Sequence, residues 1–178
     1  MGQVQRLCQR AQQGDEHAAC ELLRLVYAKI FGYLRRLCGN AEDAEDLTQE
    51  TFVKVWLSLG SFRGRCAFST WVHKIAYHVY LDHRRRKTGA VQQSDAWWQG
   101  RMDKSPGPFK SAEEKQLAEK LYAASEQLDE EKKQVIYLHF YQGLSLRDTA
   151  YVLNQPPSTI KYRFRKVMEQ LRSEMDDA

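Results

Sequence analysis

The chain has 178 residues, a formal net charge of +4 and an apolar share of 43%. No stretch approaches the roughly 20 consecutive apolar residues of a membrane-spanning helix, and the N-terminus lacks the apolar segment of a signal peptide. Scattered cysteines without a CxxC pair are typical of a reducing compartment. These cysteines are Cys8, Cys20, Cys38 and Cys66. The composition excludes membrane-spanning and disulfide-rich secreted proteins, and it predicts a cytoplasmic protein of one or two small domains.

Charge is unevenly distributed along the chain. Residues 41–50 hold five acids and no base. Residues 63–87 hold seven bases against Asp82 alone, and residues 161–172 hold five bases against Glu169 alone. One acidic surface and two separate basic surfaces indicate at least two kinds of partner.

Helical periodicity runs through the first half of the chain. Apolar residues repeat in steps of three and four from Ala19 to Leu37, which predicts a helix that Gly39 and Asn40 end. A second helix is predicted from the acidic run to about Gly60. Its apolar residues are Leu47, Phe52, Val55 and Trp56. A third helix runs out into "DHRRRK" and is expected to bury Trp71, Ile75 and Val79.

Residues 87–112 interrupt the helical pattern. They contain Gly or Pro at five positions and show no sustained period, which favours an interdomain linker. The expected division is therefore a domain over 1–87, a linker over 88–112 and a domain over 113–178. Trp97 and Trp98 are expected to pack on a neighbouring surface. The fold class predicted is all-α, with two small helical domains joined by a flexible linker.

The second domain is predicted to hold a helix-turn-helix. Helices are expected over 117–128 and 132–142, with Gly143 as the residue that follows the second. In "GLSLRDTAYVLNQPPSTIKYRFRK", Ser145 and Asp148 have the spacing of a capping box that opens a short helix. Two adjacent prolines then fit a turn, because Pro157 would fall at the first helical position, where a missing N–H is harmless.

The helix after the prolines has an apolar face and a basic face. Its apolar residues are Ile160, Phe164, Val167 and Leu171. The opposite side carries Ser158, Tyr162, Arg165, Lys166 and Glu169, flanked by Lys161 and Arg163. A short helix, a tight turn and a second helix of this kind predict binding in the DNA major groove, with flanking bases on phosphates.

Two long stretches together resemble the extracytoplasmic-function (ECF) group of the sigma-70 family, which are bacterial RNA polymerase sigma factors. "EDAEDLTQETFVKVW" followed by "FRGRCAFSTWVHKIA" is similar to the second region of that family. "LDEEKKQVIYLHFYQGLSLRDTAYVLNQPPSTIKYRFRKVMEQLR" is similar to the fourth region. The resemblance covers nearly all of the chain except its ends and the linker.

The resemblance implies a protein that binds core RNA polymerase and directs it to promoter DNA. The acidic helix would dock on the clamp helices of the largest polymerase subunit. The implied polymerase contacts are Asp43, Asp46, Gln49 and Glu50. The fourth region would read the −35 element through Ser158, Thr159, Lys161, Tyr162, Arg163, Arg165 and Lys166. Tyr162 replaces a small residue that is common there, which implies a changed sequence preference.

The segment after the acidic helix would read the −10 element. The helix is expected to turn Thr70, His73, Lys74, Tyr77, Tyr80 and Arg84 outward, and cations with interleaved rings suit single-stranded DNA. Arg63 and Phe68 match the family's pocket for a flipped-out base. The implied −10 contacts are Arg63, Phe68, Lys74, Tyr77, His78, Arg84 and Arg85. Family members often have Asn in place of His78, so the base preference stays open. The group also implies control by an anti-sigma factor, in some members membrane-bound, without membrane insertion by this chain.

Two other classes compete with this interpretation. A helix-turn-helix regulator without polymerase would explain the second half, but it leaves the acidic helix and the basic–aromatic helix unexplained. A metal-dependent enzyme acting on nucleic acid would use His17 with Cys20, or His73, His78 and His83 near Cys66. Neither set completes a known ligand pattern. We therefore expect no metal, no cofactor and no catalysis by the chain itself.

Overall fold

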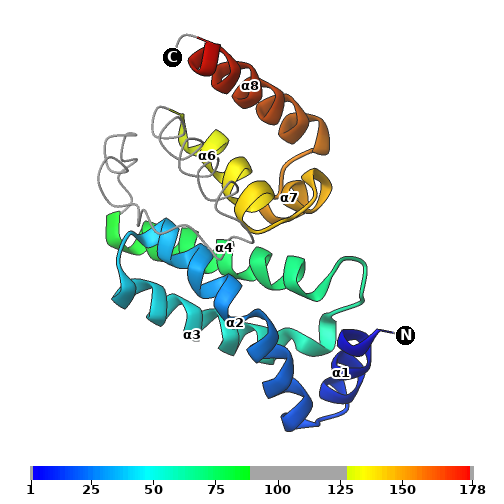
Figure 1. Cartoon of the computed structure of the whole chain (residues 1–178). Helices are drawn as coiled ribbons and strands as arrows, with labels where there is room; N and C mark the ends of the chain where they lie inside the picture. The colour runs from blue at the N-terminus through cyan, green and yellow to red at the C-terminus, as the bar shows by residue number, and fades with distance from the viewer. Residues whose placement is uncertain (1, 89–127, 177–178) are drawn as a thin grey trace. The chain divides into compact units, whose positions relative to one another are not determined.

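The structure, a computed structural model, describes residues 2–88 and 128–176. Throughout these ranges the regular structure is helical, without a strand, so the predicted all-α class is confirmed. The helices are α1 (Gln3–Gln12), α2 (Glu16–Cys38), α3 (Ala41–Ser58), η1 (Leu59–Ser61), α4 (Phe68–Thr88), α6 (Glu130–Ile136), η3 (Tyr137–Tyr141), α7 (Leu146–Leu153) and α8 (Pro157–Asp176) (Figure 1). The chain divides into two compact units, Met1–Gln92 and Gln93–Ala178.

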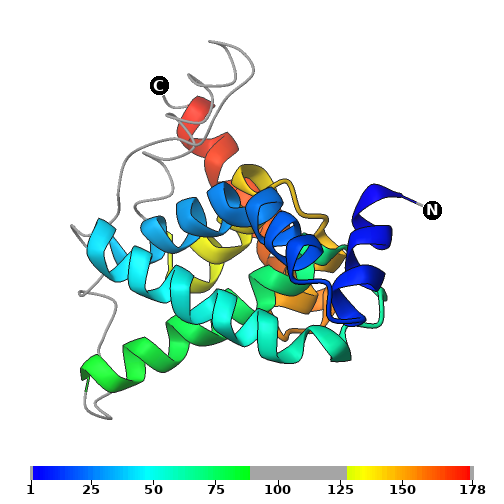
Figure 2. The same cartoon turned by 90° about the horizontal axis from the view of Figure 1, so that it is seen from below.

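The first unit is a helical bundle centred on α2. Helix α2 packs against α1, α3 and α4, and α3 packs against α4, as two perpendicular views show (Figures 1 and 2). Large apolar side chains from α2 fill the interior, among them Leu22, Ile30 and Leu34. Helix α1 also braces the loop before α4, because the Gln12 side chain donates to the carbonyls of Leu59 and Phe62 at 3.0 and 2.8 Å.

Local chemistry sets the boundary between α2 and α3. Gly39 takes the left-handed conformation that ends α2, with φ of +74°. Asn40 then caps α3, since its side-chain oxygen accepts from the backbone N–H of Asp43 at 2.8 Å. The predicted stop at these two residues is therefore confirmed. At its other end α3 gives way to the 3₁₀ turn η1, close to the expected end at Gly60.

The expected faces of α3 and α4 were wrong in part. Trp56, placed on the apolar face of α3, is exposed. Thr70, His73 and Tyr80, expected to point outward from α4, are buried. Besides Thr70 and His73, the buried residues of α4 are the apolar or aromatic residues Phe68, Val72, Ala76, Val79 and Tyr80. Trp71 and Ile75 are only half-buried, since they lie at the edge of this buried face.

Contact with α2 explains why α4 buries a different face from the one predicted. The His73 ring lies 5.5 Å from the ring of buried Tyr33 on α2, and its Nδ1 lies 2.7 Å from the carbonyl oxygen of Ser69. A buried imidazole is tolerated when it is hydrogen-bonded in this way. Hydrophobicity alone cannot assign such a residue to the core.

The second unit packs α8 against α6 and α7. Asp129 caps α6 by accepting from the backbone N–H of Lys132 at 2.9 Å. The helix predicted over 132–142 forms, but Tyr137–Tyr141 is a π turn, with the Gln142 N–H bonded to the Tyr137 carbonyl. Aromatic contacts of this turn reach α8, where the His139 and Phe140 rings lie 5.1 and 5.9 Å from the Phe164 ring. The predicted helix over 117–128 except its last residue, Trp97 and Trp98, and all but the start of the linker lie outside the described residues.

The double proline is a turn between two helices, as predicted. Ser145 caps α7, accepting from the Asp148 N–H at 3.0 Å, and Asn154 ends α7 in the left-handed conformation with φ of +53°. Pro157 is the first residue of α8. The carbonyl of Pro156 accepts from the N–H groups of Thr159 and Ile160, so the start of α8 keeps its hydrogen bonds.

Helix α8 buries Ile160 and Val167 completely and Phe164 partly, as its sequence predicts. Its other side faces solvent, and this geometry is what a helix-turn-helix requires. Across the described ranges, no helix combines the length and the apolar character that crossing a bilayer would take.

Replacing Ser145, the cap of α7, tests whether its hydrogen bond stabilises that helix. We expect Ser145→Ala to lower the free energy of opening of α7 by about 1 kcal/mol, because the Asp148 N–H loses its acceptor. Native-state hydrogen exchange of the α7 amides measures this. Ser158→Ala, at an exposed position of α8, is the matched control and should leave α7 within about 0.5 kcal/mol. Equal effects of the two variants would contradict the cap.

Candidate functional site

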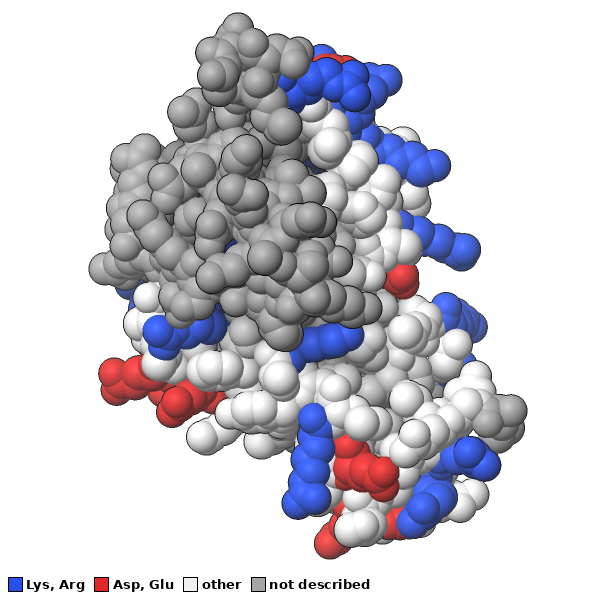
Figure 3. All heavy atoms as spheres, viewed as in Figure 1, with Lys and Arg blue, Asp and Glu red and all other residues white. Residues whose placement is uncertain are grey.

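The exposed face of α8 is basic and carries one aromatic ring. Tyr162 is 55% exposed, and the guanidinium of Arg165 lies 5.7 Å from the centre of its ring. Most residues predicted for this site face solvent, namely Ser158, Lys161, Tyr162, Arg165 and Lys166. In the space-filling view, Lys and Arg side chains gather along the part of the molecule that holds α8 (Figure 3).

Two other predicted residues of α8 are placed differently. The Arg163 side chain is only 17% exposed and forms an ion pair with Glu131 of α6. It therefore ties α8 to α6, a contact that the sequence pattern did not reveal. Thr159 is half-buried in the first turn. Among the α8 side chains that the structure describes, the one acid is Glu169, whose carboxylate lies 2.8 Å from Lys166 and 3.7 Å from Arg165. The hydrogen bond from Lys166 holds the pKa of Glu169 below its ordinary value.

The outer surface of α4 presents a mixture of cations and rings. His78 is exposed, and its ring lies 6.2 Å from the half-buried Tyr77 ring. Lys74, one turn before His78, is half-buried. Further along, Arg84 lies 6.0 Å from the Tyr80 ring and Arg85 forms an ion pair with Asp82. Apart from Phe68, the residues of α4 predicted to contact the −10 element are therefore exposed or half-buried. They do not form one continuous exposed surface.

Phe68 does not reach the surface. It is 4% exposed and packs against the rings of Phe62 and Trp71, with centroids 5.6 and 5.9 Å away. The side chain is therefore too deeply buried for the predicted direct contact with DNA. Arg63 lies in that loop beside Gly64, whose φ is +68°, and it is exposed.

Helix α3 uses its acidic residues in two directions. Asp46 and Gln49 are exposed, whereas Asp43 and Glu50 are turned toward α4 and paired there. The outward face continues past Gln49 into exposed apolar residues, which are Val53, Trp56 and Leu57. Leu57 is 78% exposed. Sequence reasoning missed this apolar extension, although α3 carries more apolar residues than one buried face can hold.

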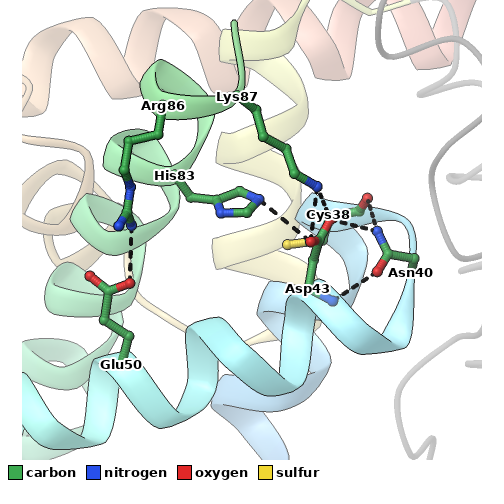
Figure 4. A network of polar contacts seen from close by, with 7 residues as sticks. All are labelled: Cys38, Asn40, Asp43, Glu50, His83, Arg86 and Lys87. Carbon is green, nitrogen blue, oxygen red and sulfur yellow. Dashed lines mark hydrogen bonds and ion pairs between the residues drawn. The ribbon is translucent and has the colours of Figure 1, made fainter. Parts of the chain in front are cut away.

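Asp43 joins α3 to the last turn of α4 (Figure 4). The Lys87 ammonium donates to its two oxygens at 2.6 and 2.9 Å, and the Asn40 side chain donates at 2.8 Å. The His83 Nε2 lies 3.7 Å away. Partial burial raises the pKa of Asp43, but the hydrogen bonds from Lys87 and Asn40 outweigh burial and bring the pKa below its ordinary value. The carboxylate is therefore ionised and held in place.

Glu50 makes a second link between the same helices (Figure 4). Its carboxylate lies 3.1 Å from the Arg86 guanidinium and 3.1 Å from the Lys54 ammonium. Burial opposes ionisation, yet these two cations keep the pKa of Glu50 below its ordinary value. Beneath the network, burial raises the pKa of the Cys38 thiol to about 12, with a further contribution from Asp43. Cys38 is therefore a buried thiol rather than a reactive thiolate.

The described residues contain no group of three His, Cys, Asp or Glu placed to hold a metal ion. His73 and His78 each direct Nδ1 at a backbone carbonyl one turn earlier, at 2.7 Å. His83 faces Asp43. The three imidazoles thus have separate partners on different sides of α4.

The geometry defines a two-part helical protein with basic faces suited to nucleic acid, and comparison with known proteins gives the family. Residues 22–89 match the family model for Sigma-70 region 2, and residues 118–171 match that for Sigma-70 region 4. The chain belongs to the sigma-70 family and is an ECF RNA polymerase sigma factor.

Relatives align over almost the whole chain. The RNA polymerase sigma-H factor of Pseudomonas aeruginosa is 33% identical over 180 residues, covering 95% of this chain and 92% of that protein. The ECF sigma factor SigW of Bacillus subtilis is 25% identical and covers 98% and 97%. Among solved structures, RpoE from Bartonella quintana has a TM-score of 0.66 at 23% identity, covering 88% of this chain and 95% of that one. CnrH also has a TM-score of 0.66, at 22% identity, covering 96% of both chains. The two structures support the fold.

The α3–α4 network predicts a stability that falls in acid. The pKa values of Asp43, Glu50 and His83 all lie below their ordinary values of 3.8, 4.5 and 6.5, so the unfolded chain binds more protons in acid. Their contribution is complete above the ordinary values and is lost as the pH falls through the lowered ones. We expect the temperature of half-unfolding, measured by circular dichroism, to decrease as the pH is lowered from 6.5 into the acid range. The D43N/E50Q double variant should show a shallower fall below pH 4.5, where the two carboxylates titrate, and an unchanged slope in that range would refute this origin.

Proposed function

We propose that the two units divide the work of promoter recognition, with the first unit docking on core RNA polymerase and reading the −10 element, and the second reading the −35 element. The observation that carries this proposal is the pairing of an exposed acidic–apolar face on α3 with separate basic faces on α4 and α8. A regulator that acts without polymerase needs no such α3 face.

Docking on polymerase is assigned to the outward face of α3. Asp46 and Gln49 are exposed there, and Leu57 and Val53 extend the face with apolar surface. A partner that presents cations followed by apolar side chains would match this order. Asp43 and Glu50 contribute less, because their carboxylates are already paired with α4.

Reading of the −10 element is assigned to α4 and the loop before it. Tyr77 and His78 offer rings that can stack on unpaired bases, and Lys74 lies beside them for the backbone. Arg63 lies in the preceding loop, where an extruded base would meet it. Arg84 and Arg85 lie further along α4 and suit phosphates rather than bases.

Reading of the −35 element is assigned to α8. Tyr162, Arg165 and Lys166 project from its exposed side and can reach base edges in the major groove. Lys161 suits a phosphate. Arg163 is a positioning residue, since its ion pair with Glu131 fixes α8 against α6.

Control by an anti-sigma factor is part of the same proposal. RpoE from Bartonella quintana was solved in complex with the anti-sigma factor NepR, and CnrH was solved with the cytosolic domain of CnrY. The similar fold of this chain supports a partner of that type. We place the protein in the cytoplasm, where polymerase and promoter DNA meet, and assign it no catalysis of its own.

Transcription in vitro tests the function directly. Core polymerase with this chain should start RNA at defined sites of a genomic template, and mapping RNA 5′ ends should reveal shared −10 and −35 sequences. Core polymerase alone should not use those sites. A chain that binds DNA but neither joins core polymerase nor starts RNA would instead be a plain helix-turn-helix regulator.

Substitution on α3 tests the docking face. Asp46→Asn with Leu57→Ser should weaken binding to core polymerase about tenfold or more, because one charge and the most exposed apolar side chain of the face are lost. Surface plasmon resonance on immobilised core measures this. Glu16→Gln on α2 is the matched control, and a similar loss in that variant would move the docking surface elsewhere.

Two substitutions on α8 separate base reading from phosphate contact. Arg165→Ala should cost about 1–3 kcal/mol at one −35 position and relax selectivity there. Lys161→Ala should weaken binding on every sequence and lower the salt slope by about 1. Competition binding on −35 duplexes with each base pair varied provides both readouts. Uniform loss from Arg165→Ala would count against base reading by this residue.

A further inference from the structure

The basic run at the end of α4 is almost neutralised within the chain. The Arg84 guanidinium lies 6.0 Å from the Tyr80 ring, and each of the next three cations has a carboxylate partner. These ion pairs are Arg85 with Asp82, Arg86 with Glu50, and Lys87 with Asp43. The run that the sequence marks as a binding surface for DNA is thus engaged with acids of its own unit.

Two of these acids come from α3 rather than from α4 itself. Asp43 and Glu50 lie 44 and 36 residues before their partners, so the pairs close only when the two helices pack. The carboxylate oxygens stand 2.6 Å from the Lys87 ammonium and 3.1 Å from the Arg86 guanidinium. A DNA phosphate would need the same donors at the same distances. Phosphate and carboxylate therefore compete for each cation.

The Asp43 pair is more than a chance surface contact. The Asp43 side chain is 22% exposed, and Asn40, the cap of α3, holds it from the other side. The backbone N–H of Asp43 is bonded to Asn40 as well. The carboxylate is thereby oriented by the helix start before any cation arrives, which reduces the entropy lost in forming the pair.

We propose that Asp43 and Glu50 form an internal clasp, defined as their ion pairs with Lys87 and Arg86, which holds these two cations away from DNA phosphates in the unbound chain. The clasp weakens DNA binding by the unbound protein and is opened by a phosphate backbone or by a cationic partner of α3. Asp43 and Glu50 are on this account positioning residues for the end of α4.

The clasp also couples the two faces of the first unit. A cation from a partner of α3 that attracts Asp43 or Glu50 leaves Lys87 or Arg86 available to DNA. By linkage, DNA bound at the end of α4 strengthens the hold of that partner by the same factor. This consequence rests on the proposed docking of α3 on polymerase, whereas the clasp itself concerns the chain alone.

Charge-neutral variants of the full chain test the clasp without polymerase. The probe is a fluorescein-labelled oligothymidylate, and its anisotropy is measured at several salt concentrations. Asp43→Asn and Glu50→Gln should each tighten binding about two- to fivefold. The released cation should also steepen the salt dependence, by about 0.7 for each one engaged on a single strand.

Glu45→Gln is the matched control. It makes the same change of charge on the same helix, but Glu45 is exposed and lies on the side of α3 opposite Asp43 and Glu50, so it should leave the affinity within about twofold. A gain from Glu45→Gln equal to that from Asp43→Asn would overturn the clasp, because overall charge would then suffice.

Double-mutant cycles identify the cations involved. Lys87→Met keeps the apolar stem and removes the charge, so Asp43→Asn should bring no gain in that background. Arg86→Met should likewise cancel the gain from Glu50→Gln. If Asp43→Asn destabilises the start of α3, the cycle of Glu50 with Arg86 is still a valid test, because Glu50 lies in the middle of that helix. Gains that persist in both cycles would refute the proposal.

The failure of this proposal is distinct from failure of the proposed function. If neither the wild-type chain nor the D43N/E50Q variant binds the oligothymidylate at low salt, the clasp is wrong, whereas initiation by the holoenzyme is judged separately by its transcripts. If the variants bind more tightly but no transcript forms, the clasp stands and the polymerase assignment falls.

Discussion

Burial of one apolar stripe on each of the two helices that carry basic residues, α4 and α8, is the constraint on which the rest of the structure depends. On α4, Val72, Ala76 and Val79 are fully buried, and on α8, Ile160 and Val167 are fully buried. Once these residues are inside, the helical repeat decides which side chains can meet a partner. The same packing brings α3 against α4 closely enough for carboxylates from one helix to pair with cations from the other.

Helix boundaries could be predicted from sequence because the chemistry that sets them is local. Gly39, Ser145 and Pro157 each act through their own backbone or through groups three residues away. The face of α4 could not be predicted as well, since His73 is buried by a contact with Tyr33, forty residues earlier. Apolar spacing placed Trp71 and Ile75 inside, where the structure has them half-buried.

Pairing across helices was the part of the site least visible in the sequence. Arg163 looked like a phosphate contact, and only the fold shows that Glu131 already holds it. Glu50 looked like one of several equivalent acids, yet its carboxylate is paired with Lys54 and with Arg86 of α4, whereas Asp46, one turn earlier, is exposed. Charge content reports how many ions a segment carries, whereas the packing decides which of them remain available to another molecule. Family membership could be inferred from the sequence because it depends on long ordered motifs, and not on which face of a helix is exposed.

The π turn at Tyr137–Tyr141 has a consequence for how this fold can change over time. A π turn accommodates one residue more than the α-helical turn it replaces, without altering the flanking helix. The rings of His139 and Phe140 in this turn both contact the Phe164 ring of α8. A change in the length of the turn would therefore move the aromatic contacts that support α8, whereas the two prolines lie after α7, outside this segment.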